Sequence, residues 1–235
     1  EPVMGAGGVI VPPATYWDKI QKVCRKYDIL VVADEVICGF GRTGQLFGSN
    51  TYDIQPDILV MSKQMSSSYM PISAFVFSDA IYQVVADNTA KIGTFGHGFT
   101  ASGHPVATAV SLENLKIIEE RDLVGNARRV APRLQDGLRQ LADHPLVGEV
   151  RGVGLIAAVE LVADKASKRP FDPVGKVGGY LFNRAQEHGL IVRNLGDSIA
   201  FCPPLIITAE QLDEVVARFS KALDETAAWV ASEGL

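Results

Sequence analysis

The sequence predicts an α/β fold in which polar residues follow buried strands. Ile29–Ala33 is a continuous apolar run, typical of a parallel strand covered on both faces, and Asp34 follows it. Ile58–Met61 is a second run of this kind, and Lys63 comes shortly after it. Segments with helical apolar spacing surround both runs. Because ligands of open α/β sheets bind outside the carboxyl ends of strands, we expect Asp34 and Lys63 at the functional edge.

The N-terminal segment predicts a β-α-β unit. Glu1–Val3 is expected to be the end of a strand, and a helix is expected from about Ala14 to Tyr27. The strand that ends at Asp34 completes the unit, whose crossover is expected to be right-handed. Cys38–Gly48 is rich in glycine and polar residues and is therefore predicted to be a loop.

The central segment alternates between loops and regular elements. A serine-rich loop at Lys63–Met70 precedes a predicted strand at Ile72–Phe77 and a short helix at Asp79–Ala86. Ala90–His104 contains four glycines and is predicted to be a loop. A helix is expected from Pro105 to about Glu120, since proline is favourable in the first turn of a helix.

The remainder predicts a smaller α/β domain, so that residues 1–115 and 116–235 form two domains. Apolar residues from Leu123 to Leu141 have helical spacing, and Pro132 predicts a kink. A helix is expected around Val174–His188, and Thr208 with Gln211 forms a capping-box pattern before a final helix. Strands are predicted at Glu149–Val153, Leu155–Leu161, Leu190–Arg193 and Ile199–Cys202.

Composition narrows the functional classes. The 235 residues are 47% hydrophobic and 21% charged, as in globular proteins. The net charge of −5 and the lack of a basic cluster argue against a nucleic-acid partner. No apolar run approaches the roughly 18 residues of a membrane span, so no membrane partner is expected. The cysteines, Cys24, Cys38 and Cys202, form no metal or disulfide pattern, which predicts a cytoplasmic protein.

An aspartate and a lysine at neighbouring strand ends have two interpretations. They can form an ion pair at the sheet edge. Alternatively, they can hold pyridoxal phosphate (PLP), which needs a lysine amine for its Schiff base and a carboxylate that keeps its pyridine nitrogen protonated. The spacing of Asp34 and Lys63 alone leaves both interpretations open.

Longer motifs resemble those of the class III aminotransferases, which are fold-type I PLP enzymes. They occur in the family's order and cover nearly the whole chain. The motifs are Val31–Gly44, Pro56–Lys63, Gly96–Pro105, Arg151–Leu161 and Cys202–Thr208. The resemblance implies that the chain holds the C-terminal part of the large PLP-binding domain and the small C-terminal α/β domain.

The first residues resemble a motif that lies near mid-chain in that family. Glu1-Pro-Val-Met-Gly-Ala-Gly-Gly8 is similar to its Glu-Pro-x-x-Gly-x-Gly-Gly motif. The resemblance therefore implies that the half of a normal subunit that precedes this motif is absent here. That half would carry the aromatic residue that stacks on the pyridine ring and the loop that cradles the phosphate.

The resemblance assigns roles to five residues. It implies that Lys63 is the Schiff-base lysine, which also shuttles a proton, and that Asp34 contacts the pyridinium nitrogen. Val36 is similar to the aliphatic residue packed on one ring face, although a plain buried valine would look the same. Thr100 is similar to the threonine that reaches the PLP phosphate of the neighbouring subunit, and Phe99 to a residue of the partner's substrate pocket. A homodimer with shared sites is therefore expected.

Other residues near these motifs have weaker interpretations. Glu35 should point away from the ring and be structural, and His97 is expected to be a loop or interface histidine. Glu1 is similar to a glutamate that lies behind the direct cofactor contacts. The run Gln64-Met-Ser-Ser-Ser68 departs from the family's Gly-x-x-Ser-Gly, which leaves the detailed shape of the pocket open.

Two alanines and one arginine bear on the substrate. Members that act on α-amino acids resemble one another in having an arginine and a glutamate at the positions of Ala200 and Ala6. Losing both together avoids an unpaired buried charge. Arg193 instead resembles the mobile arginine with which amine:pyruvate (ω-) transaminases bind a carboxylate. The alternative is a strand-end arginine paired with Asp197.

The resulting prediction is a PLP-dependent transaminase with small-molecule substrates. It would move an amino group from an amine or ω-amino compound to pyruvate by a ping-pong mechanism. A β-alanine, GABA or diamine aminotransferase of the same class is the first alternative. An aminomutase fits less well, because Gly39–Gly44 resembles the aminotransferase form of that loop. An inactive fragment that lacks half of its site is the alternative from another class.

Overall fold

The computed structural model describes residues 1–235, and the chain forms two compact units. The first unit contains residues 1–2, 12–40 and 45–122, and the second contains residues 3–11, 41–44 and 123–235. Neither unit is therefore one continuous stretch of sequence. The boundary expected between residues 115 and 116 falls inside a helix of the first unit, and the division of the family fold into domains stays a prediction.

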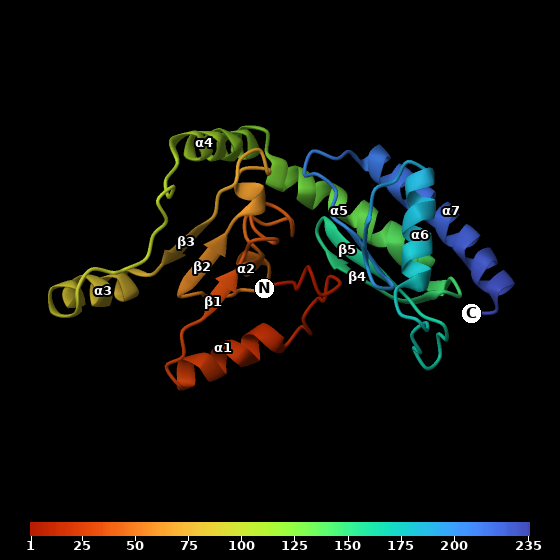
Figure 1. Cartoon of the computed structure of the whole chain (residues 1–235), viewed down its shortest axis with the longest axis horizontal. Helices are drawn as coiled ribbons and strands as arrows, with labels where there is room; N and C mark the ends of the chain where they lie inside the picture. Colours follow the sequence, from red (N-terminus) through yellow and green to blue (C-terminus); the bar gives the residue numbers. More distant parts are fainter. The chain divides into compact units, whose positions relative to one another are not determined.

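The first unit contains a three-stranded mixed sheet. Its strands are β1 (Val32–Asp34), β2 (Ile58–Met61) and β3 (Ala74–Phe77), in the order β1-β2-β3 (Figure 1). β1 and β2 are parallel, whereas β3 is antiparallel to β2. The predicted bounds of β2 are confirmed. β3 begins two residues later than predicted.

Four α-helices belong to the first unit. They are α1 (Tyr16–Lys26), α2 (Gly48–Thr51), α3 (Asp79–Ile92) and α4 (Pro105–Glu120). The predicted α4 is confirmed, with Pro105 in its first turn. The helix predicted at Asp79–Ala86 is longer than expected. It ends before Gly93, whose φ of 94° takes the chain out of the helix.

Two predictions about strands in the N-terminal part of the chain were wrong. Glu1–Val3 forms no strand, and the only pairing nearby is an isolated bridge between Met4 and Ile10, so the β-α-β unit lacks its first strand. The strand expected at Ile29–Ala33 begins only at Val32. The reason is that the Val31 N–H donates to a side chain, Asp57 Oδ2, at 2.7 Å, and not to a neighbouring strand.

The predicted two-sided burial of this strand was also wrong. Val31 and Ala33 are buried, but Val32 between them is 53% exposed. Ile29 and Leu30 are likewise about half exposed. β1 is an edge strand of the sheet, and residues of the first unit cover only one of its faces.

The second unit contains a four-stranded antiparallel sheet of order β4-β5-β7-β6. Its strands are β4 (Val147–Val153), β5 (Ile156–Leu161), β6 (Arg193–Leu195) and β7 (Ser198–Phe201). The strand predicted at Leu190–Arg193 was therefore placed too early. Leu195 pairs with Ser198 across the two-residue loop Gly196-Asp197, and this short hairpin sets the register of β6.

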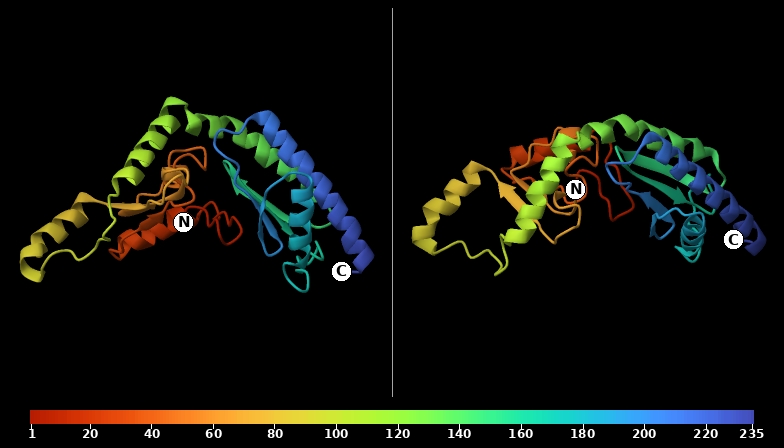
Figure 2. Two further views of the ribbon diagram at one scale, coloured as in Figure 1. Left: turned by 45° about the horizontal axis from the view of Figure 1, so that its top comes forward. Right: turned by 90° about the horizontal axis from the view of Figure 1, so that it is seen from above.

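Three α-helices pack with this sheet: α5 (Leu123–Arg139), α6 (Lys176–Glu187) and α7 (Ala209–Glu233). Both views of Figure 2 show α7 alongside α5 and α6. Phe219 of α7 is fully buried and meets Phe201 of β7 edge-on, with ring centroids 4.9 Å apart. α5 continues through Pro132. None of the helices of the chain combines the length and the apolar character that a membrane span requires.

The predicted capping box at the start of α7 is confirmed. The Gln211 N–H donates to Thr208 Oγ1 at 3.2 Å, and the Thr208 N–H donates to Gln211 Oε1 at 3.0 Å. These two bonds satisfy backbone donors that a helix start otherwise leaves unpaired.

Candidate active site

Asp34 and Lys63 reach the same edge of the first sheet. Asp34 is the last residue of β1 and pairs in register with Val60 of the parallel strand β2. Lys63 follows Val60 by three residues and opens a short 3₁₀ turn, Lys63–Met65. Asp34 is half-buried and Lys63 is exposed. The two side chains form no ion pair with each other, so the simple electrostatic interpretation of this spacing is not observed.

The carboxylate of Asp34 has a fixed orientation. Its Oδ1 accepts a hydrogen bond of 2.9 Å from the N–H of Val36, two residues further on. This is the local side-chain-to-backbone bond that aspartates make at turns. It holds the carboxylate at the strand end and leaves Oδ2 for another partner. Val36 is half-buried immediately beside it.

Glu35 has a structural role, as the alternation of the strand predicted. Its side chain is fully buried, and its carboxylate accepts hydrogen bonds from the N–H of Gly48 at 2.8 Å and from the N–H of Ser49 at 2.6 Å. The Ser49 hydroxyl donates a third bond at 2.6 Å. Glu35 thus ties the segment after β1 to the start of α2, and it takes no part in the edge where Asp34 lies.

The turn that carries Lys63 has a backbone of high conformational energy. Lys63, Ser67 and Ser68 all have positive φ, at 38°, 48° and 62°. For residues with a side chain, such conformations cost about 1–2 kcal/mol each relative to the right-handed region. The turn surrounds a hollow of about 270 Å³ that Lys63 lines together with Ser66 and Met70. Surrounding contacts must hold this conformation.

Hydrogen bonds at both ends of the turn hold it. Ser62 Oγ donates to the Ile72 carbonyl at 2.8 Å, and Ser66 Oγ donates to the Met70 carbonyl at 2.7 Å. A third anchor is Asn114 of α4, whose side chain bonds three groups of the turn.

Sequence reasoning missed Asn114. The available signal was its place on the inner stripe of α4, three and four residues from buried Ser111 and Ile118. A polar amide on such a stripe needs hydrogen-bond partners. The sequence does not show that these partners belong to the lysine turn.

Phe99 and Thr100 lie in an exposed loop. Phe99 is 78% exposed, and every residue from Thr89 to Val106 is exposed in the single chain. The ring of His97 meets Phe99 and Phe75 edge-on, at centroid distances of 5.9 and 5.2 Å. His97 is thus part of an aromatic cluster, in agreement with its interpretation as a loop residue. Phe99 also lines a hollow of about 510 Å³.

This second hollow adjoins the lysine turn. Its walls include Ser62, Pro71 and Ile72, which also line the hollow that contains Lys63. Phe99 and Lys63 therefore border neighbouring spaces of one unit. Thr100 lines neither of them.

Arg193 lies in the second unit and makes no ion pair with Asp197. It is exposed at the start of β6, where it pairs in register with Ala200 of β7. Asp197 is buried, and its two carboxylate oxygens accept the N–H groups of Gly175 and Gly178, each at 2.7 Å. The structural alternative for Arg193 is therefore not observed.

One row of residues crosses all four strands of the second sheet on the same face. Arg151, Ala158, Ala200 and Arg193 are successive cross-strand partners. Directly opposed residues of an antiparallel pair have Cβ atoms about 4.5–5.5 Å apart. Arg193 thus lies on the strand next to Ala200, the position where the enzymes that act on α-amino acids are expected to have their arginine.

The segment of residues 3–11 lies on this same face. Arg151 is largely buried, and its Nε donates to the Gly8 carbonyl at 2.8 Å while its Nη2 donates to Ser198 Oγ at 3.0 Å. Gly8 has a φ of 106°, and an added Cβ would lie 3.0 Å from the guanidinium. Ala6 of this segment is exposed.

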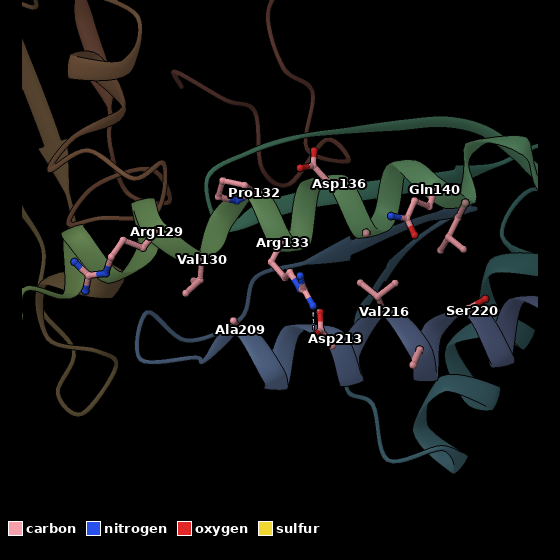
Figure 3. Close-up of a pocket in the computed structure, with 13 residues that line it drawn as sticks. Arg129, Val130, Pro132, Arg133, Asp136, Gln140, Ala209, Asp213, Val216 and Ser220 are labelled. Atoms are coloured by element: carbon pink, nitrogen blue, oxygen red, sulfur yellow. Dashed lines mark hydrogen bonds and ion pairs between the residues drawn. The ribbon is translucent and has the colours of Figure 1, made fainter.

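A hollow larger than the two at Lys63 and Phe99 lies elsewhere, in the second unit. It has a volume of about 750 Å³ and is lined mainly by residues of α5 and α7. Figure 3 shows these residues on the two helices. Arg133 and Asp213 bridge it with two bonds of 2.5 and 2.7 Å. None of the predicted site residues lines it, and its walls are mostly the outer turns of two helices. Size alone therefore does not locate the site, and we place it at the sheet edge.

Residues 1–223 match the family model for Aminotransferase class-III. The chain is 51% identical to gamma aminobutyrate transaminase 1, mitochondrial, of Solanum lycopersicum over 226 residues, which are 96% of this chain and 44% of that protein. It is 47% identical to vanillin aminotransferase of Capsicum chinense, covering 96% of this chain and 49% of that protein. The chain thus spans about half the length of the curated relatives it matches.

Solved structures agree. The omega transaminase from Pseudomonas jessenii in complex with PMP is 62% identical, with a TM-score of 0.95, over 98% of this chain and 51% of that chain. A structure described as a transaminase with L-ala is 61% identical, with a TM-score of 0.95, over 97% of this chain and 54% of that one. The family match, the identities and the shared fold lead to one conclusion. The chain belongs to the class III aminotransferases, fold-type I enzymes whose cofactor is pyridoxal phosphate.

Proposed function

We propose that this chain provides the lysine and the aspartate of a transaminase that moves an amino group from an amine to pyruvate. The residues at the sheet edge fit PLP. Lys63 offers an exposed primary amine for covalent attachment, and Asp34 offers a half-buried carboxylate with one oxygen already fixed by Val36. When bound there, the cofactor supplies an electron sink for the bond that breaks at the substrate Cα.

The protein's own groups manage protons and position. Asp34 holds a proton on the pyridine nitrogen, since a carboxylate stabilises the charged ring. The Nζ of Lys63 would act as the general acid–base group that carries a proton to and from the substrate Cα. Val36, which is half-buried beside Asp34, would pack its aliphatic side chain against one face of the cofactor ring.

Arg193 supports pyruvate as the amino acceptor. Its guanidinium is exposed and makes no ion pair with Asp197, which is bound by two backbone amides. Such a group can take a carboxylate with two parallel hydrogen bonds. It can also turn toward solvent when the substrate is an amine without a carboxylate. This availability of Arg193 is the observation that favours a keto-acid acceptor and an amine donor.

A borohydride experiment tests the attachment. Purified protein is saturated with PLP, reduced, digested and analysed by mass spectrometry. We expect a pyridoxyl adduct on Lys63 and none on Lys91 or Lys116, which are exposed lysines of the same unit. An unmodified Lys63 would contradict the proposed function and favour an inactive fragment.

The acceptor is tested separately. Initial rates with an aryl-alkyl amine are compared with pyruvate and with 2-oxoglutarate as acceptor. Pyruvate should be preferred. A preference for 2-oxoglutarate would instead favour another aminotransferase activity of the class.

A GABA aminotransferase is the second candidate, because curated relatives at 46–51% identity carry that name; a β-alanine or diamine enzyme is related to it. GABA has its own carboxylate, whereas an aryl-alkyl amine has none. If Arg193 binds the carboxylate of GABA as well as that of pyruvate, Arg193→Ala should lower kcat/KM for both the donor and the acceptor. Selective loss of pyruvate favours the first candidate.

We also propose a homodimer in which Thr100 reaches the cofactor phosphate of the partner. The exposure of all residues from Thr89 to Val106 supports an interface there. Mixing inactive Lys63→Ala and Thr100→Val enzymes tests it. Activity should return, because one site of each mixed dimer combines an intact lysine with the other subunit's threonine. If Thr100 served its own subunit, no competent site could form.

None of the three cysteines, Cys24, Cys38 and Cys202, forms a disulfide bond. A reducing compartment suits such residues. For this reason we propose that the protein is located in the cytoplasm. Fractionation of the source cells tests this.

A further inference from the structure

We propose that Asn114 is a positioning residue for Lys63. It acts together with Ser67 and Gln64, through the turn that carries the lysine. This inference rests on the proposed role of Lys63. None of the three side chains needs to touch the substrate or the cofactor. Their effect is to hold the backbone from which the lysine amine projects.

The contacts of Asn114 converge on the turn. Its Nδ2 donates to the Gln64 carbonyl at 2.7 Å and to the Met65 carbonyl at 3.2 Å. Its Oδ1 accepts from Ser67 Oγ at 2.8 Å. A single side chain of α4 thus bonds the first, second and fourth residues after Lys63, across about 50 positions of sequence.

Chemistry fixes the direction of this amide. The two backbone carbonyls can only accept hydrogen bonds, so the NH₂ group must face them. The carbonyl of the amide then faces the Ser67 hydroxyl, which donates to it. The same hydroxyl accepts from Gln64 Nε2 at 3.0 Å. The amide of Asn114 and the hydroxyl of Ser67 therefore each have partners of the right kind.

The network explains how this chain departs from the glycine-containing run Gly-x-x-Ser-Gly. Ser68 has a φ of 62° at the position where that run has its last glycine, and Ser67 has a φ of 48°. Glycine adopts such angles at little cost, whereas serine does not. Gln64 stands where the run has its first glycine, and its side chain is the one that bonds Ser67. In this chain, side-chain hydrogen bonds stabilise backbone angles that glycine would adopt at little cost.

The consequence concerns the reactive amine. Lys63 itself has a φ of 38° and directly precedes the bonded carbonyls of Gln64 and Met65. If the turn relaxes toward ordinary angles, the lysine side chain starts from a different place and direction. Displacements of about 1 Å near a reacting group can lower a rate by about a hundredfold.

The test compares two asparagine variants in the cofactor-loaded enzyme. Asn114→Leu removes the network. Asn126→Leu is the matched control, because Asn126 of α5 also donates its amide to two carbonyls, those of Leu205 at 2.7 Å and Ile207 at 3.1 Å, but within the second unit. The measured quantities are kcat, KM and the pH midpoint of the visible absorbance of the Lys63-bound cofactor.

Asn114→Leu should lower kcat by about tenfold to a hundredfold. It should shift the midpoint of the visible band by about one pH unit and change KM for the amine little. Asn126→Leu should lower the melting temperature but leave kcat and the midpoint unchanged. Equal midpoints and equal kcat in the two variants would overturn the inference.

A second variant keeps the test decisive if Asn114→Leu does not fold. Ser67→Ala removes the hydroxyl but keeps the two bonds from Asn114 to the carbonyls, so it should shift the midpoint in the same direction by less. An unchanged midpoint in Ser67→Ala would then overturn the inference. Wild-type protein without a pyridoxyl adduct on Lys63 would instead refute the proposed function itself.

Discussion

Arg193 and Asp197 lie four residues apart at the β6–β7 hairpin, yet they form no ion pair. Both oxygens of the Asp197 carboxylate are occupied by the backbone N–H groups of Gly175 and Gly178, at the start of α6. This arrangement leaves the Arg193 guanidinium exposed. The second unit thus binds its buried Asp197 carboxylate with backbone amides, and Arg193 takes no part in these bonds.

Removing Arg193 should therefore affect substrates selectively. Hydrogen bonds to a charged group contribute about 1.5–3 kcal/mol, so Arg193→Ala should lower kcat/KM for pyruvate by about 10- to 100-fold. An aryl-alkyl amine without a carboxylate should lose little. Initial rates at varied pyruvate and varied amine measure this, with Arg139→Ala, an exposed arginine of α5, as the control. Equal losses for both substrates would contradict the carboxylate role.

Asp34→Asn should separate cofactor attachment from catalysis. The amide oxygen can still accept from the Val36 N–H, so the strand end should keep its shape. A neutral amide no longer stabilises a protonated ring nitrogen, and kcat should fall by about 10²–10³-fold, as for other preorganised charges. The Lys63 adduct should still form after borohydride reduction. Full activity in this variant would exclude Asp34 as the ring partner.

Glu35→Leu should destabilise the protein. Glu35 is fully buried, and its loss leaves the Gly48 N–H, the Ser49 N–H and the Ser49 hydroxyl without an acceptor. Each unsatisfied buried donor costs about 1–3 kcal/mol, so the free energy of unfolding should fall by about 3 kcal/mol or more. Urea titration measures it. Glu120→Gln, at the exposed end of α4, should change it by less than about 0.5 kcal/mol.

Asp57 should contribute to the acid sensitivity of the fold. Its hydrogen bond from the Val31 N–H, followed by the bond and charge of Arg25, lowers its pKa. A lowered pKa in the folded state means that the stabilisation is complete above the unfolded value of about 3.9 and is lost as pH falls through the folded value. Asp57→Asn should thus flatten the decline of the urea midpoint below about pH 4. An unchanged pH profile would show that Asp57 makes no such contribution.

Local signals predicted much of the fold. The bounds of β2 and α4 and the capping box of α7 follow from contiguous residues: an apolar run, a proline in a first turn, and a threonine three residues before a glutamine. The positions of Asp34 and Lys63 at one edge follow from the same kind of reasoning, because parallel strands end together.

The features that sequence reasoning missed depend on distant partners. β1 begins at Val32 because a side chain 26 positions away takes the Val31 N–H. β6 begins at Arg193 because a two-residue hairpin sets its register, whereas the apolar run before it suggested an earlier strand. Asn114 bonds the lysine turn, and backbone amides bond the Asp197 carboxylate. Neither interaction can be recognised from a pattern in neighbouring residues.

Two short segments, residues 3–11 and 41–44, belong to the second unit. They limit where the chain can be cut when domains are exchanged between enzymes. Arg42 donates to the carbonyls of Leu155 and Pro203, and Gly8 accepts from Arg151, so distant pieces of the chain hydrogen-bond to residues in and beside the strands of residues 123–235. A chimaera that exchanges only residues 123–235 would contain a sheet that lacks its native contacts with residues 3–11 and 41–44. Successful domain transplants between such enzymes should therefore carry all three stretches together.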